Sequence, residues 1–143
     1  MNAAKIVLIE DNPADVFLVE MALQESGILY EMTRFNNGEE AVASLCAPGG
    51  PMAKTFRPDA ILLDLNTPRS DGIEVLEKLS RTPHLADVPI AIITSSQARS
   101  DKHRVGLIGR TRYIEKPSHL DEFLTTVGQA VKDMLQCDAA LRR

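Results

Sequence analysis

The sequence of 143 residues contains no tryptophan and only two cysteines, Cys46 and Cys137. Two cysteines this far apart provide neither a disulfide framework nor the clustered ligands of a zinc site, so we expect two reduced thiols. No apolar run approaches the ~20 residues of a membrane-spanning helix, and residues 1–5 lack the pattern of a signal peptide. These absences predict a cytoplasmic protein without a membrane partner.

The chain also lacks an excess of positive charge, with 16 Lys and Arg residues against 20 Asp and Glu residues and a net charge of −4. This balance argues against nucleic acid as a partner. Hydrophobic residues at 44% and charged residues at 25% are ordinary for a globular protein. Because no repeat, low-complexity tract or linker divides the chain, we expect residues 1–143 to form one domain.

Strand-like and helix-like segments alternate along the whole sequence, which predicts a parallel sheet with helices on both faces. The expected strands are residues 6–9, 30–35, 60–63, 90–93 and 113–114. The first of five expected helices should begin after Asn12, a good N-cap followed by Pro13, and stop at Gly27. The weakest expected helix is 97–109, which carries few apolar residues.

Polar residues stand at the carboxyl ends of four of these strands. Glu10 and Asp11 follow the first strand, Asp64 follows the third, Thr94 ends the fourth, and Lys116 follows the fifth. In an open parallel sheet, ligands bind outside the carboxyl ends of the strands, so these side chains should converge on one pocket. Three carboxylates, one hydroxyl and one ammonium suit a divalent cation and a phosphoryl group.

The three carboxylates would raise one another's pKa unless a cation lay among them, and magnesium accepts such oxygen ligands. Asp64 can serve as a nucleophile because carboxylates form aspartyl-phosphates, and phosphoryl transfer mainly requires positioning and charge neutralisation. Lys116 would then face a phosphoryl oxygen, and the hydroxyl of Thr94 would hydrogen-bond the added group. The histidines fall in loops or at helix starts and are interpreted as solvated: His84, His103 and His119.

With these residues the sequence resembles the receiver domain of bacterial two-component response regulators, from about Lys5 to Leu135. The resemblance implies an α/β, flavodoxin-like fold, with a five-stranded parallel sheet in the order 2-1-3-4-5 and five flanking helices. It also implies a single-domain response regulator that accepts a phosphoryl group from a sensor histidine kinase. Only eight residues follow Leu135, so we expect no output domain and an output through an unidentified downstream protein.

The resemblance assigns roles to the pocket residues. Glu10 and Asp11 become the magnesium acids, and Asp64 with the backbone carbonyl of Asn66 adds further ligands to the metal. Asp64 is the phosphoacceptor, and Lys116 contacts the phosphoryl group. Because self-dephosphorylation would be slow at most, the protein is not expected to be an enzyme.

The resemblance also implies a conformational switch. Thr94 becomes the switch hydroxyl and Tyr113 the switch aromatic, and Pro117 is expected to follow a cis peptide bond. Phosphorylation would then remodel the face made by the fourth helix, the fifth strand and the fifth helix, because a local charge change biases a bistable surface.

A narrower resemblance concerns the stand-alone regulators paired with bacterial and cyanobacterial phytochromes. It rests on residues 10–15, on the Pro- and Gly-rich segment 47–54 and on residues 94–96. It implies a phytochrome histidine kinase as phosphoryl donor and a homodimer through the face of the fourth helix, fifth strand and fifth helix. Residues 97–112 depart from the usual composition of that subfamily, because they are richer in Arg and Lys.

The basic stretch from Arg99 to Arg112 has two interpretations that the sequence leaves open. It can be a solvated face, or it can dock an acidic partner or pair with acids such as Asp133 across a dimer. Two other functions are also considered. A magnesium-dependent phosphatase would need a second aspartate where Asn66 stands, and a constitutive interaction module would not need the intact set of pocket residues.

Overall fold

The computed structural model describes residues 3–46, 57–65, 71–95, 99–108 and 111–141, with the backbone alone for 99–101 and 137–141. The elements in chain order are β1 (Ala4–Ile9), α1 (Pro13–Glu25), β2 (Tyr30–Phe35), α2 (Gly38–Leu45), β3 (Ala60–Leu63), α3 (Gly72–Arg81), η1 (Pro83–Leu85), β4 (Ile90–Thr94), α4 (Arg99–Gly106), β5 (Thr111–Glu115) and α5 (Leu120–Leu141). No helix formed by these residues is both long and apolar enough to span a membrane.

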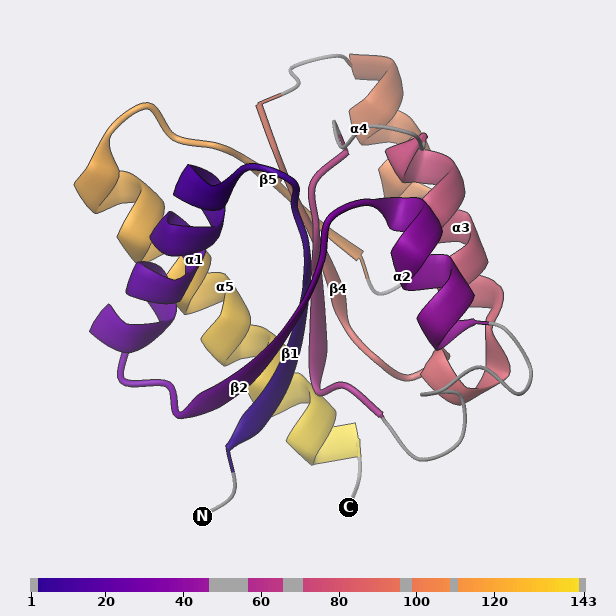
Figure 1. Ribbon diagram of the computed structural model, residues 1–143, viewed down its shortest axis with the longest axis horizontal. Coiled ribbons are helices and arrows are strands. Elements are labelled where there is room, and N and C mark those ends of the chain that lie inside the picture. Colours follow the sequence, from indigo (N-terminus) through magenta and orange to yellow (C-terminus); the bar gives the residue numbers. More distant parts are fainter. Residues whose placement is uncertain (1–2, 47–56, 66–70, 96–98, 109–110, 142–143) are drawn as a thin grey trace.

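The five strands form one parallel sheet in the order β2-β1-β3-β4-β5, which is the order that the family resemblance implies (Figure 1). In the register, Ile9 at the end of β1 lies opposite Leu63 at the end of β3. Thr94 at the end of β4 lies opposite Glu115 at the end of β5. The carboxyl ends of these four strands therefore meet at one edge of a flavodoxin-like fold.

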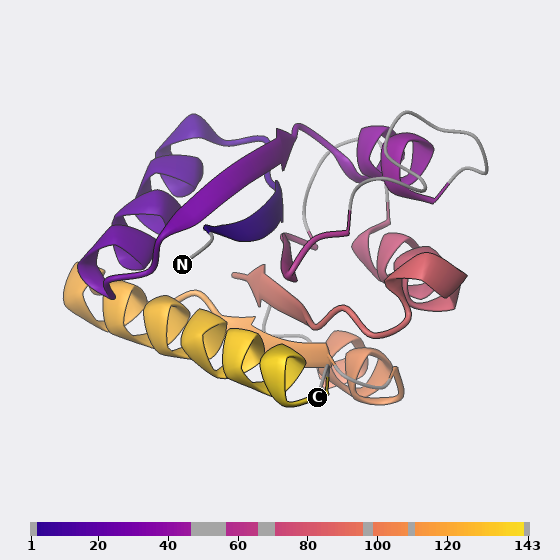
Figure 2. The ribbon, with the colours of Figure 1, turned by 90° about the horizontal axis from the view of Figure 1, so that it is seen from below.

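The helices cover both faces of the sheet, with α1 and α5 on one side and α2, α3 and α4 on the other (Figures 1 and 2). Alternate residues of β1 face the two layers: Ile6 and Leu8 pack with α1 and α5, whereas Val7 and Ile9 pack with α2 and α3. A central parallel strand is apolar throughout because both of its faces are buried.

Helix α1 begins and ends at the residues that the sequence predicts. The side chain of Asn12 caps the helix by accepting a hydrogen bond from the N–H of Ala14 at 2.9 Å. At the other end, Gly27 adopts a φ of 72°, and the N–H of Ile28 donates to the carbonyl of Leu23 at 3.0 Å. This is the Schellman arrangement, in which glycine tolerates the left-handed conformation that stops the helix.

Two expectations are wrong. His84 is half-buried rather than solvated, and its Nε2 lies 2.6 Å from the carbonyl oxygen of Leu45, so it joins η1 to the end of α2. No described residue follows a cis peptide bond, and the bond before Pro117 is therefore trans. The weak helix signal in residues 97–109 corresponds to a helix of only 8 residues, α4, in which Val105 is buried.

Candidate functional site

Three of the side chains that the sequence places in one pocket are in contact. The amine Nζ of Lys116 lies 3.2 Å from Oδ2 of Asp64 and 3.5 Å from Oε2 of Glu10. Each residue directly follows a strand of the sheet, and the parallel register brings their strand ends together. The side chains of Glu10 and Asp64 are only 4% and 7% exposed, so the carboxylates and the ammonium interact where water screens them weakly.

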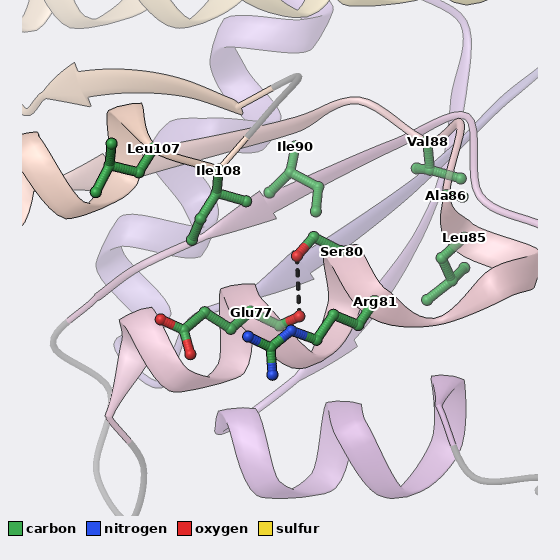
Figure 3. A pocket seen from close by; sticks show the side chains of 9 residues that line it. All are labelled: Glu77, Ser80, Arg81, Leu85, Ala86, Val88, Ile90, Leu107 and Ile108. Atoms are coloured by element: carbon green, nitrogen blue, oxygen red, sulfur yellow. Dashed lines mark hydrogen bonds between the residues drawn. The ribbon is translucent and has the colours of Figure 1, made fainter.

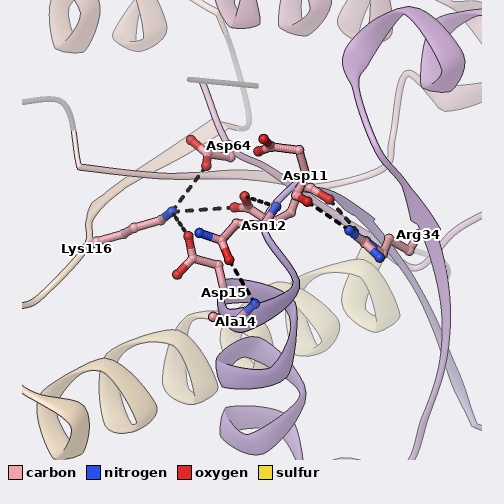
Figure 4. A network of polar contacts seen from close by, with 8 residues as sticks. Asp11, Asn12, Ala14, Asp15, Arg34, Asp64 and Lys116 are labelled. Carbon is pink, nitrogen blue, oxygen red and sulfur yellow. Dashed lines mark hydrogen bonds and ion pairs between the residues drawn. The ribbon is translucent and has the colours of Figure 1, made fainter. Parts of the chain in front are cut away.

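A fourth residue, which sequence analysis missed, makes the shortest contact in the site. Oδ2 of Asp15 lies 2.9 Å from Nζ of Lys116 (Figure 4). Asp15 belongs to the first turn of α1 and not to a strand end. Its signal in the sequence was an acid just inside a helix that starts directly after the acidic pair, but an acid at that position is also expected from the helix dipole alone.

The predicted metal ligands do not all lie together. Ligand oxygens of Glu10, Asp15 and Asp64 are within 4.8 Å of one another. Asp11 is exposed and stands outside this group, although it follows Glu10 directly. Asn66, whose backbone carbonyl was predicted as a ligand, lies outside the described residues.

Arg34, on β2, was also missed by sequence analysis. Its Nε donates to the backbone carbonyl of Glu10 and its Nη2 to that of Asp11, both at 3.1 Å (Figure 4). The segment is held from its other side by the N–H of Asn12, which donates to Oε1 of Glu10 at 3.2 Å. The acidic pair is therefore fixed by hydrogen bonds that leave the carboxylate of Asp11 outside the ion-pair cluster.

The two predicted switch residues lie on the neighbouring strands β4 and β5. Thr94 is fully buried at the end of β4, and its backbone carbonyl accepts a hydrogen bond from the N–H of Lys116 at 2.8 Å. Tyr113 is partly buried and packs on the core layer that includes Val105 of α4. Thr94 is thus joined through the backbone to Lys116, and Tyr113 contacts the layer under α4.

The basic stretch has one ion pair among the side chains that the structure describes. Nη1 of Arg112 lies 3.7 Å from Oδ2 of Asp133 in α5 of the same chain. Both side chains are more than 40% exposed, so this pair contributes about 0–1 kcal/mol to stability. Lys102 and Arg104 of α4 are exposed.

The charges in the cluster are not balanced by Lys116 alone. Burial raises the pKa of Glu10 to about 8, and the hydrogen bond and negative charge of Asp64 act in the same direction against the opposing N–H of Asn12 and charge of Lys116. Burial by itself would lower the pKa of Lys116. The hydrogen bond that Lys116 donates to Asp15 and the charges of the three carboxylates outweigh the effect of burial, so the pKa of Lys116 is raised.

These features fit a hard divalent cation. The cluster supplies only carboxylate oxygens, the ligands that Mg²⁺ and Mn²⁺ prefer. Burial and the neighbouring charge of Asp64 raise the pKa of Glu10, so an added positive charge would stabilise these closely spaced acids in their ionised form. Glu10 and Asp64, the two buried acids, are the residues best placed to hold such an ion.

A cavity beside the amino end of β4 has a different character. It measures about 490 Å³ and lies between α3, η1, the start of β4 and the segment that follows α4 (Figure 3). Its lining combines the polar residues Glu77, Ser80 and Arg81 with six apolar residues, of which Leu107 is strongly exposed. None of the predicted pocket residues lines this cavity, so the candidate site is the acidic cluster.

The order of the sheet and the cluster at its edge agree with one protein family. Residues 6–128 match the response regulator receiver domain. The chain belongs to this family. A curated relative, the polar-differentiation response regulator DivK of Brucella anthropi, is 30% identical over 128 residues, which are 90% of this receiver and 96% of DivK.

Two solved structures are similar to this receiver over nearly its whole length. The phosphorylated cyanobacterial phytochrome response regulator RcpA has a TM-score of 0.83 and 34% identity, with 94% of this chain and 95% of that one covered. The Mn²⁺-bound response regulator Rcp1 has a TM-score of 0.81 and 32% identity, with 93% and 95% covered. Rcp1 of Synechocystis is 38% identical over 96 residues, which are 67% of this receiver and 65% of Rcp1.

Proposed function

We propose that this receiver accepts a phosphoryl group on Asp64 from a sensor histidine kinase and signals to a partner protein. The observation that carries the proposal is the structural environment of Asp64. Its carboxylate is buried at the carboxyl edge of the sheet, 3.2 Å from the amine of Lys116 and within the cluster that contains Glu10. Phosphoryl transfer requires an acceptor held in place and positive charge beside it, and this arrangement supplies both.

In the proposed reaction, a carboxylate oxygen of Asp64 attacks the phosphorus of a phosphohistidine on the kinase. The O–P bond forms as the P–N bond breaks, and the electron pair of the broken bond returns to the imidazole nitrogen of the kinase. Lys116 donates an N–H to a phosphoryl oxygen and so offsets negative charge in the transition state. The acyl phosphate hydrolyses slowly, so the protein acts as a phosphoacceptor and not as an enzyme.

The metal proposed for this reaction is Mg²⁺. When bound, it would neutralise charge on the phosphoryl oxygens. Glu10 and Asp64 would hold it, with Asp11 and the backbone carbonyl of Asn66 as the further ligands that the family resemblance implies. Support comes from the all-oxygen donor set and from the similarity to Rcp1, whose structure was determined with Mn²⁺ bound.

The donor proposed for this receiver is a phytochrome histidine kinase. The support is the similarity to RcpA, a cyanobacterial phytochrome response regulator, which extends over 94% of this chain. Transfer from a purified, autophosphorylated phytochrome kinase should therefore be faster than transfer from a histidine kinase of an unrelated pathway. Equal rates from the two kinases would contradict this part of the proposal.

The output surface proposed for this receiver is the face of α4, β5 and α5, through which a homodimer and the downstream partner would bind. Thr94 and Tyr113 would carry the change from Asp64 to this face. Helix α4 has only 8 residues, and among its described side chains only that of Val105 is buried. So little packing makes α4 an element that a small change in charge can shift.

The test of the proposed function is the intact mass of the protein after incubation with acetyl phosphate. We expect one phosphoryl adduct that requires Mg²⁺, that is absent in Asp64→Asn and that persists in Asp133→Asn, the same change at an exposed site. If the wild-type protein gained no adduct, the proposed function would be wrong and a constitutive interaction module would be favoured. An adduct that remained in Asp64→Asn would show that another residue is the acceptor.

A further inference from the structure

The amine of Lys116 is held by three carboxylates that approach it from different elements. The contact with Asp15 of α1, at 2.9 Å, is shorter than those with Asp64 at 3.2 Å and Glu10 at 3.5 Å. Figure 4 shows Asp15 and Asp64 on opposite sides of the amine. Lys116 is thus bound to the proposed phosphoacceptor, Asp64, on one side and to Asp15 on the other.

Asp15 is carried by a helix, whereas the other acids of the cluster follow strands. Asp15 lies in the first turn of α1, which begins at Pro13 and is capped by the side chain of Asn12. A carboxylate in the first turn is also stabilised by the helix dipole. The backbone at Asp15 is therefore held by α1 and not by the contact with Lys116.

The three carboxylates have different roles in the proposed reaction. Asp64 gains the phosphoryl group, and both Glu10 and Asp64 would direct their oxygens towards the metal. Their contacts with Lys116 therefore weaken at the stage when the amine must be in place. Asp15 is half-buried, with a side chain 26% exposed, and the proposed reaction assigns it neither the phosphoryl group nor the metal.

We propose that Asp15 is a positioning residue that anchors the amine of Lys116 during phosphoryl transfer. This inference rests on the proposed function. The carboxylate of Asp15 accepts one hydrogen bond from the amine, whose other hydrogen bonds in the structure go to Asp64 and Glu10. In the proposed reaction these other N–H groups are available to the phosphoryl oxygens on Asp64. Without that anchor, a lysine side chain with four rotatable bonds spreads over several conformers and is aligned for a smaller fraction of the time.

The first experiment measures the rate of phosphorylation by acetyl phosphate at saturating Mg²⁺ in Asp15→Asn. We expect a rate about tenfold lower than in wild type, the size typical of coupling within a hydrogen-bonded ion pair. Asp133→Asn is the matched control and should change the rate by less than twofold. In a Lys116→Met background, Asp15→Asn should cause no further loss, since it acts through Lys116.

Two results of this experiment would overturn the proposal. One is that Asp15→Asn lowers the phosphorylation rate by the same factor in the wild-type and in the Lys116→Met background. The other is a loss of magnesium affinity that accounts for the whole rate defect, because Asp15 would then be a metal ligand. Magnesium affinity is therefore measured in parallel by calorimetry, and thermal melting of each variant verifies that it is folded.

The second experiment does not depend on phosphorylation. Lysine residues are acetylated with an N-hydroxysuccinimide ester in the presence of Mg²⁺, and the modification of each lysine is measured by peptide mass spectrometry. Relative to the exposed Lys132, Lys116 should react several-fold faster in Asp15→Asn than in wild type or Asp133→Asn. Unchanged reactivity of Lys116 in Asp15→Asn would refute the anchoring role of Asp15. A wild-type protein that gained no phosphoryl adduct would refute the proposed function instead, and the labelling would still decide the role of Asp15.

Discussion

The amine of Lys116 lies 3.2 Å from the carboxylate of Asp64, although 52 positions of sequence separate the two residues. Lys116 follows β5 and Asp64 follows β3, and β4 lies between these strands in the sheet. The contact is therefore made outside the sheet edge, across the end of β4. There the backbone carbonyl of Thr94 holds the N–H of Lys116 at 2.8 Å.

Removing the charge of Lys116 should destabilise the protein most when no metal is available. Lys116→Met leaves the carboxylates of Glu10, Asp15 and Asp64 without their shared cation, and we expect a loss of about 1–3 kcal/mol in chelator. Magnesium should restore most of this loss because it supplies positive charge to the same cluster. Urea denaturation with and without Mg²⁺ measures both effects. Equal stability of variant and wild type in chelator would contradict the electrostatic account of the site.

Arg34 should affect metal binding although, among the described residues, its side chain donates hydrogen bonds to backbone carbonyls and not to the metal-binding carboxylates. Its guanidinium holds the carbonyls of Glu10 and Asp11, so Arg34→Ala frees the acidic segment. We expect magnesium affinity to fall about tenfold, as is typical when a residue that orients metal ligands is lost. Calorimetric titration measures it. Arg112→Ala removes the exposed pair with Asp133 and should leave the magnesium affinity unchanged. An equal loss of magnesium affinity in both variants would refute a specific role of Arg34.

Glu10 should make the stability of the metal-free protein depend on pH. Because its pKa is raised to about 8 in the folded state from 4.5, folding is favoured while Glu10 is protonated. That contribution is lost as the pH rises from about 4.5 through 8. The free energy of unfolding of Glu10→Gln relative to wild type should therefore increase between pH 5 and pH 9 in chelator. Denaturation series at several pH values measure this difference, and a constant difference would contradict the raised pKa.

Gly128 should be required for the packing of α5 against α1. A Cβ at this position would overlap the hydroxyl of Ser26 and lie 3.1 Å from the carbonyl oxygen of Ala22. We expect Gly128→Ala to destabilise the protein by about 1–3 kcal/mol and Ser26→Gly to recover part of the loss. Gly106→Ala is the control, because nothing lies within 4 Å of its added methyl group. Thermal melting compares the variants, and equal melting temperatures for both alanine variants would contradict the predicted overlap.

The elements that the sequence predicts best are those whose signals are local. The buried strand at residues 60–63 is a continuous apolar run, and α1 is delimited by Asn12, Pro13 and Gly27. Helix α4 was the weakest prediction because its few apolar residues leave the period of the helix poorly marked. The half-buried position of His84 had no local signal, since it depends on the carbonyl of Leu45, which lies 39 positions away.

The amino-acid sequence by itself predicted a parallel sheet and the meeting of Glu10, Asp64 and Lys116 at its carboxyl edge, and the order of the strands followed from the family resemblance. Each of these residues directly follows a strand, and the strands of a parallel sheet all present their carboxyl ends to the same side. Only the tertiary structure decided that Asp15 joins the cluster, that Asp11 stays outside it and that Arg34 holds the acidic segment. These contacts depend on how α1 and β2 pack beside β1, which sets distances and side-chain directions that no local pattern records.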